Sequence, residues 1–172
     1  MKGLIIYKGK YGATKQYAQW LSEGTDFPCI DADKFDEATL SEFDTIIIGT
    51  SVYIGKLKIG KWLKRNWHEL RDKKVYLFLV AGTPPSEKEK LTAYVRSNVP
   101  NELFNQLSLT FLPGKLIRSE LSSWDRFLLK MGSKLAEKKD PAQKIAVDYN
   151  HVDRDYLKPL FLQLRLPASV IR

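Results

Sequence analysis

The sequence contains little cysteine and little histidine. Cys29 is the only cysteine among 172 residues, so no intrachain disulfide can form, which is typical of a reducing cytosol. Cys29 lies in an apolar run and is interpreted as a small core residue rather than a reactive thiol. His68 and His151 are the only histidines, and His68 has no second ligand at helical spacing. We therefore expect no metal site.

Long apolar runs and an excess of acidic residues are also absent. No apolar stretch approaches the roughly 20 residues of a membrane-spanning helix, and the first residues follow a strand pattern rather than a signal peptide. The chain has 28 Lys and Arg against 20 Asp and Glu, a formal net charge of +8. Half of that net charge falls within residues 115–139. This asymmetry predicts an anionic partner. We expect a cytoplasmic protein with peripheral contact to the inner face of the cell membrane.

Apolar runs alternate with helical patterns along the chain, and no linker or internal repeat interrupts them. Strands are predicted at residues 3–7, 27–31, 45–49, 75–81 and 107–112. Helices are predicted at residues 14–22, 57–70, 86–98, 119–138 and 151–164, with a short helical turn at 37–42. Such alternation predicts a parallel sheet covered by helices on both faces.

The predicted fold is a single α/β domain over residues 1–172. Its sheet is doubly wound and five-stranded, with strand order 2-1-3-4-5, and its ligand lies beyond the ends of the first and third strands. Roughly thirty residues interrupt the unit formed by the fifth strand and the last helix, and connections that long usually serve a function. We therefore predict a late helical insertion.

The first connection has the composition of a phosphate-binding turn. It joins the first strand to the first helix, where backbone N–H groups and the helix N-terminus attract an anion. Its glycines allow a close backbone approach, and its threonine offers a hydroxyl. The predicted contact residues are Gly9, Lys10, Tyr11, Gly12, Ala13 and Thr14. Neither G-x-x-x-x-G-K-[ST] nor G-x-G-x-x-G is present, which weighs against ATP and dinucleotides. An ordinary strand-to-helix turn is the alternative.

Two further connections reach the same edge of the predicted sheet. The one after the third strand combines hydroxyls, an aromatic ring and a glycine, groups that suit a flat heteroaromatic ligand. The one after the fourth strand has small residues that can flank the same ring. The predicted contact residues are Thr50, Ser51, Val52, Tyr53, Ile54, Gly55, Ala81, Gly82 and Thr83. The alternative for Tyr53 is an ordinary surface aromatic residue.

These three connections resemble the FMN site of flavodoxins. The first loop of that family is commonly [ST]-x-T-G-x-T, and Gly12 and Thr14 are in register with its final Gly-x-Thr. A closer resemblance covers essentially the whole chain. It is to the flavodoxin-like, menaquinone-dependent protoporphyrinogen oxidases of bacteria, and two segments carry it. These are Ile-Gly-Thr-Ser-Val-Tyr-Ile-Gly at 48–55 and Ser-Trp-Asp-Arg-Phe-Leu-Leu-Lys-Met at 123–131.

The resemblance implies FMN as the cofactor and a place in heme biosynthesis. Electrons would pass from a reduced tetrapyrrole through FMN to a quinone, and no catalytic residue is assigned. The alternative is a flavodoxin-like electron-transfer protein that serves a redox protein partner. Simple carriers of that family tend to be acidic, so the charge of +8 favours the oxidase. Binding to nucleic acid is disfavoured because the basic residues lack interleaved aromatic residues or a reading motif.

The predicted helix at 119–138 has two interpretations. Its apolar residues recur at helical spacing and predict a single apolar face, formed by Trp124, Phe127, Leu128, Met131 and Leu135. Basic residues flank that face, namely Arg126, Lys130, Lys134 and Lys138. The helix either covers the core and exposes a basic side, or contacts an anionic membrane or the carboxylates of an amphipathic substrate.

Overall fold

A computed structural model describes residues 2–35, 37–139 and 148–166, without the side chains of 37–39 and 132–139. Its main sheet contains five parallel strands in the order β2-β1-β3-β5-β6. Their bounds are Cys29–Asp31 for β2, Gly3–Lys8 for β1, Thr45–Tyr53 for β3, Lys74–Ala81 for β5 and Ser108–Pro113 for β6. This arrangement confirms the predicted flavodoxin-like strand order, with β5 and β6 as the predicted fourth and fifth strands.

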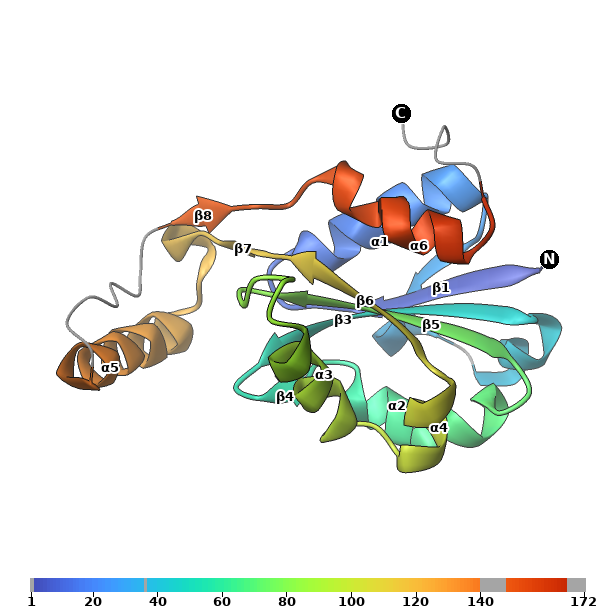
Figure 1. The fold of residues 1–172 in the computed structure, drawn as a ribbon, viewed down its shortest axis with the longest axis horizontal. Helices are drawn as coiled ribbons and strands as arrows, with labels where there is room; N and C mark the ends of the chain where they lie inside the picture. The colour runs from blue at the N-terminus through green and yellow to red at the C-terminus, as the bar shows by residue number, and fades with distance from the viewer. Residues whose placement is uncertain (1, 36, 140–147, 167–172) are drawn as a thin grey trace.

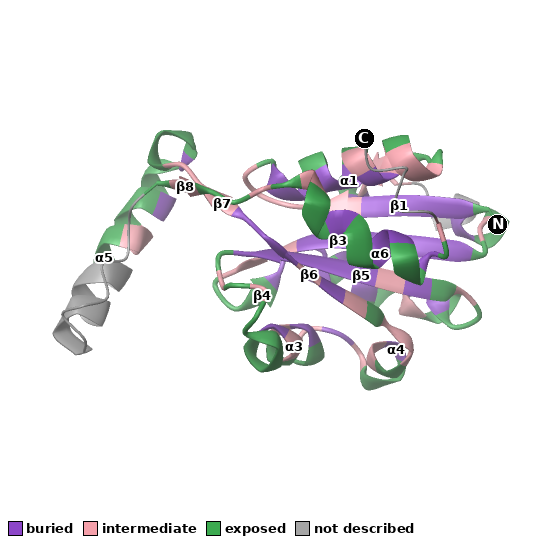
Figure 2. Ribbon diagram, turned by 45° about the horizontal axis from the view of Figure 1, so that its top comes forward, coloured by how far each residue is buried: buried purple, intermediate pink, exposed green. Residues whose placement is uncertain are grey.

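Helices cover both faces of the sheet (Figure 1). The helices α1 (Ala13–Thr25) and α6 (Lys158–Gln163) lie on one face. On the other face lie α2 (Gly60–Asn66), α3 (Lys88–Arg96) and α4 (Asn101–Gln106). Because both faces are buried, the central strands read as continuous apolar runs rather than alternating ones. Figure 2 shows this burial along β1, β3 and β5.

Neighbouring strand residues point into two separate cores. In β1, Leu4 and Ile6 pack with the cluster that includes α2, α3 and α4, whereas Ile5 packs with α1 and α6. The same alternation separates Ile46 from Ile47 in β3. All five side chains are fully buried. A one-residue shift in register would exchange the two sets, so the pattern fixes the register of the sheet.

Several helices differ in extent from the sequence prediction. Helix α2 begins only at Gly60, because β4 (Lys56–Leu57) first pairs antiparallel with the end of β3. It continues as the 3₁₀ helix η3 (Trp67–Leu70). Helix α4 was not predicted, and it follows Pro100, a residue that separates it from α3. The last predicted helix is the 3₁₀ helix η5 (Arg154–Leu157) followed by α6.

Short 3₁₀ helices occupy three other connections. They are η1 (Ala32–Lys34), η2 (Glu37–Glu42) and η4 (Arg118–Glu120), of which η2 matches the predicted helical turn. Within the described residues, no helix has the length and apolar character needed to cross a bilayer.

The late insertion contains more than the predicted helix. Its helix α5 (Ser123–Lys139) is flanked by β7 (Lys115–Leu116) and β8 (Tyr149–Asn150), which pair with each other antiparallel. Figure 1 shows α5 beyond β7 and β8, apart from the helices that cover the sheet. The strand pair was not predicted, because two residues per strand are too few to produce a periodic signal. The insertion therefore leaves the sheet at the end where the predicted ligand loops lie.

Candidate functional site

A cavity of about 340 Å³ lies where β1, β3 and β5 end. Its volume is within the range of about 300–1,000 Å³ that is typical of small-molecule sites. Its walls come from all three predicted loops and from the late insertion. The lining residues are Lys10, Tyr11, Ala13, Thr14, Ser51, Val52, Tyr53, Ile54, Val80, Ala81, Gly82, Gly114, Lys115, Leu116, Leu121, Asp125, Leu128, Leu129 and Tyr149.

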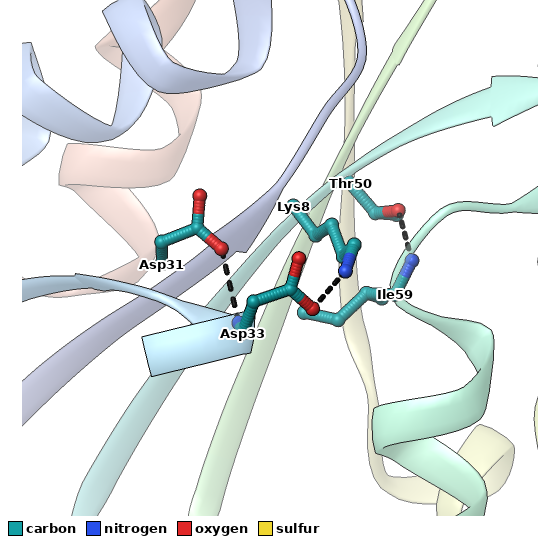
Figure 3. Close-up of polar contacts among 5 residues, drawn as sticks. All are labelled: Lys8, Asp31, Asp33, Thr50 and Ile59. Atoms are coloured by element: carbon teal, nitrogen blue, oxygen red, sulfur yellow. Dashed lines mark hydrogen bonds and ion pairs between the residues drawn. The ribbon is translucent and has the colours of Figure 1, made fainter. Parts of the chain in front are cut away.

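Most of the predicted contact residues line this cavity, and five do not. Thr83 lines an adjoining cavity of about 380 Å³. Gly9, Gly12 and Gly55 shape the turns around the cavity without lining it. Thr50 is fully buried, and its Oγ1 accepts a hydrogen bond from the backbone N of Ile59 at 3.2 Å (Figure 3). Thr50 therefore holds the segment before α2 rather than facing the cavity.

The end of β1 is anchored beside the first loop (Figure 3). Lys8 is the last residue of β1 and the register neighbour of Thr50 in β3. Its ammonium forms an ion pair with Asp33. The backbone N of Asp33 in turn donates a hydrogen bond to Asp31 Oδ1 at 3.0 Å. These contacts connect β1 to the segment after β2. They fix the strand end from which the first loop departs.

The first loop presents the N-terminus of α1 to the cavity. Gly12 precedes α1 with a positive φ of 81°, and no side chain caps the first turn. Thr14 is 2% exposed and packs against Gly9, where a Cβ atom would lie 2.5 Å from Thr14 Oγ1. Lys115 Nζ comes within 3.9 Å of the position that a Cβ atom would take at Gly12. The helix N-terminus attracts an anion at this point. The Lys115 ammonium lies beside it and pairs with Glu120 Oε2 at 3.0 Å.

The second predicted loop, which follows β3, is a hairpin. β3 continues to Tyr53, and the chain then reverses through Ile54 and Gly55, which have positive φ values of 49° and 69°. Asn98 ties the hairpin to the neighbouring chain by donating to the carbonyl of Gly55 at 3.0 Å and accepting from the N of Leu57 at 3.3 Å. A β-branched residue rarely adopts positive φ, and Ile54 is also 67% exposed at the cavity rim.

Two buried hydroxyls in the cavity wall have no hydrogen-bond partner among the described residues. They are Tyr11 Oη and Ser51 Oγ. A buried polar group without a partner costs about 1–3 kcal/mol. The site therefore suits a ligand that carries hydrogen-bonding atoms as well as apolar surface.

A polar cluster joins the insertion to two of the loops. Asp125 of α5 is 6% exposed, and its Oδ2 lies 2.6 Å from Lys10 Nζ. Its Oδ1 accepts a hydrogen bond from the Tyr53 hydroxyl. Lys10 Nζ also lies 3.5 Å from the centroid of the Tyr53 ring. Burial lowers the pKa of Lys10, but the hydrogen bonds with Asp125 and Tyr53 outweigh it and leave that pKa raised.

The sequence prediction did not include the cavity residues of the insertion. Gly114, Lys115, Leu116, Leu121, Asp125, Leu128, Leu129 and Tyr149 all come from that segment. A signal for α5 was present, because positions 121, 125, 128 and 129 recur at helical spacing. A signal for Tyr149 was lacking, since it belongs to a two-residue strand.

The predicted apolar face of α5 does not cover the core, because most of its described residues are exposed. Leu128 and Leu129 line the cavity, whereas Trp124, Phe127 and Met131 are 63%, 50% and 47% exposed. The rings of Trp124 and Phe127 stack on each other with centroids 5.6 Å apart. The side chains of Leu135, Lys134 and Lys138 lie outside the described residues. Helix α5 therefore has an inner apolar face toward the cavity and an outer apolar face toward solvent.

The remaining reactive groups do not form a competing centre. Cys29 is partly buried beside the core rather than within it. Burial raises the pKa of its thiol to about 11, so this residue is protonated at neutral pH. Within residues 2–35, 37–139 and 148–166, no three His, Cys, Asp or Glu side chains gather as a metal site.

Comparison with known proteins places this chain in a family. A model of the flavodoxin domain matches residues 4–143. No curated protein sequence matches the chain. Similar solved structures include a flavodoxin from the domain Archaea, with 16% identity, 79% of this chain and 99% of that chain covered, and a TM-score of 0.47. Flavodoxin 1 from Bacillus cereus has 17% identity, 80% and 98% coverage, and a TM-score of 0.47.

A third similar structure is a flavoprotein in complex with FMN from Lactobacillus acidophilus. It has 18% identity, 65% and 91% coverage, and a TM-score of 0.46. The family model covers most of this chain, and the chain belongs to the flavodoxin domain family. This membership supports the prediction of FMN as the cofactor.

Proposed function

From this family membership, we propose that the protein is an FMN-dependent oxidoreductase whose flavin occupies the cavity at the ends of β1, β3 and β5. The observation that carries the proposal is the convergence of three loops on one cavity with an uncapped helix N-terminus at its edge. Bound FMN supplies the transfer of electrons, while the protein binds and orients it.

The residues of the cavity fit the separate parts of FMN. The phosphate would be held by the backbone N–H groups of residues 10–13, the N-terminus of α1 and the Lys115 ammonium. Tyr53 and the backbone around Gly82 would flank the ring system. The hydroxyls of Tyr11 and Ser51 would gain the partners that they lack among the described residues.

The finer proposal is that a reduced tetrapyrrole is the electron donor and a quinone the acceptor. The electrons and protons that leave the tetrapyrrole would be taken up by the quinone, which becomes a quinol. Leu121, Leu128 and Leu129 support this proposal, because they place apolar surface from the insertion beside the flavin loops. An apolar wall excludes water and suits a large, flat macrocycle.

The alternative is an electron-transfer protein that docks on a redox protein partner. The exposed side chain of Ile54 at the cavity rim favours it, since a single apolar contact beside the flavin suits a transient interface. The two functions differ in whether the purified protein turns over small molecules without a protein partner.

We also propose that the outer face of α5 contacts an anionic membrane. Trp124, Phe127 and Met131 are exposed on this face, and Arg126 is an exposed basic residue of the same helix. Residues 115–139 hold half of the net charge of the chain. Aromatic and basic groups together favour the interface of an anionic bilayer, and salt weakens the electrostatic part. A protein partner on this face is the competing outcome.

The test of function uses FMN-loaded protein without oxygen. Addition of protoporphyrinogen should bleach the flavin absorbance, and addition of a menaquinone analogue should restore it. If neither compound changes the spectrum while a strong chemical reductant still bleaches it, the oxidase proposal is wrong and the electron-transfer alternative stands.

The test of membrane contact uses sedimentation with vesicles that contain anionic lipid. Trp124→Ser combined with Phe127→Ser should reduce binding, whereas Leu162→Ser, at a 64% exposed leucine of α6, should not. Equal binding of both variants and the wild type would show that α5 does not carry the contact.

A further inference from the structure

We propose that Asp125 is a positioning residue that fastens α5 to the flavin loops and tunes the preference of the site for oxidised over reduced FMN. This inference deepens the proposed function and rests on it. It concerns a residue that lies in the insertion, outside the three loops that define the cavity in the sequence.

Asp125 differs in charge from the other described residues of the cavity wall. Among the described lining residues it is the only acidic one, facing a site that also contains Lys10 and Lys115. It is almost fully buried, so its charge is weakly screened by water and salt. Both carboxylate oxygens are engaged, one by the Lys10 ammonium and the other by the Tyr53 hydroxyl.

The backbone of α5 supports this carboxylate. Ser122 precedes the helix, and its Oγ accepts a hydrogen bond from the N of Asp125 at 3.2 Å. The carbonyl of Ser122 accepts from the N of Arg126 at 3.0 Å. Asp125 thus lies in the first turn of α5, where the helix dipole stabilises a negative charge.

The contacts of Asp125 join three parts of the chain. Lys10 belongs to the loop after β1, Tyr53 ends β3, and Asp125 belongs to the insertion. Figure 2 shows that α5 extends away from the sheet, so few other elements restrain it. The polar contacts of Asp125 orient α5 relative to the loops, while Leu121 and Leu128 line the cavity with apolar surface. Loss of the carboxylate should loosen α5 near the cavity and leave the sheet intact.

The two opposite charges should act on the flavin in opposite directions. The buried carboxylate of Asp125 in the cavity wall disfavours the addition of electrons to FMN, and the partly exposed ammonium of Lys10 favours it. Asp125→Asn keeps the shape of the side chain and an oxygen for Tyr53, but it removes the charge. Lys10→Met removes the opposite charge at similar length. The double variant restores the original sum of charges in the site.

The experiment measures the affinity of each variant for oxidised and for reduced FMN. The ratio of these affinities should shift about tenfold toward reduced FMN in Asp125→Asn, equivalent to about 30 mV for a two-electron couple. It should shift in the opposite direction in Lys10→Met and return near the wild-type value in the double variant. The matched control is Asp148→Asn, an exposed acid of the insertion that pairs with Arg118 and does not line the cavity.

A second measurement uses the flavin-free protein. Hydrogen exchange of the amides of residues 124–131 should be faster in Asp125→Asn than in Asp148→Asn, with unchanged exchange in β1, β3 and β5. If wild-type protein binds FMN but Asp125→Asn keeps both the wild-type affinity ratio and the wild-type exchange, the inference is overturned and the proposed function stands. If wild-type protein binds no FMN, the proposed function and the redox role fail together.

Discussion

Gly82→Ala should destabilise the protein, and Tyr149→Phe should remove the cause. A Cβ atom at Gly82 would lie 2.4 Å from the hydroxyl oxygen of Tyr149, and its next nearest atom, the Tyr149 Cζ, would be 3.6 Å away. The first distance is a severe clash and the second is ordinary contact. Gly82→Ala must therefore displace Tyr149, a residue that lines both cavities.

The expected cost follows from overpacking, which typically destabilises a protein by about 1–3 kcal/mol. Gly82→Ala should lower the free energy of unfolding in urea by that amount and should weaken FMN binding. Tyr149→Phe removes only the clashing oxygen. The double variant should therefore recover most of the lost stability, although Tyr149→Phe alone should change it little. If the double variant is as unstable as Gly82→Ala, the clash with Tyr149 is not the cause and the placement of β8 beside Gly82 is wrong.

Three further substitutions or treatments test other parts of the structure. Gly12→Ala should lower the free energy of unfolding in urea by about 1–2 kcal/mol, because it forces an L-residue into positive φ. The control Gly60→Ala should leave that free energy unchanged or raise it by up to about 1 kcal/mol. Equal effects of the two substitutions would refute this backbone argument. Ile54→Asn should raise the melting temperature, since Asn-Gly favours a two-residue turn with positive φ, and an unchanged or lower value would contradict the strained turn. Because burial raises the pKa of Cys29 to about 11, its alkylation at pH 8 should be much slower in folded than in urea-unfolded protein, and equal rates would show that the thiol is not protected.

The central sheet could be predicted from sequence because its chemistry is local and repetitive. Leu4, Ile5 and Ile6 must all be apolar when helices cover both faces, and such runs are visible without any knowledge of partners. The position of the first cavity-lining loop could be predicted for the same reason, since glycines between a strand and a helix mark a close backbone approach.

The roles of single polar side chains could not be predicted in this way. Thr50 lies in a predicted ligand segment, yet its hydroxyl serves the N of Ile59, and nothing local distinguishes the two directions. Asp125 acquires its role only when α5 meets Lys10 and Tyr53, which are more than 70 residues away in sequence. Its contacts are set by tertiary structure, and the helical pattern of α5 does not specify which partner each face meets.

The cavity itself is tested most directly by comparing FMN with riboflavin, which lacks the phosphate. Fluorescence titration of flavin-free protein should show that FMN binds at least about tenfold more tightly, a difference of about 1.4 kcal/mol. That preference reflects the phosphate at the N-terminus of α1 and beside Lys115. Absence of FMN binding, or equal affinity for both flavins, would contradict the assignment of this cavity as the flavin site.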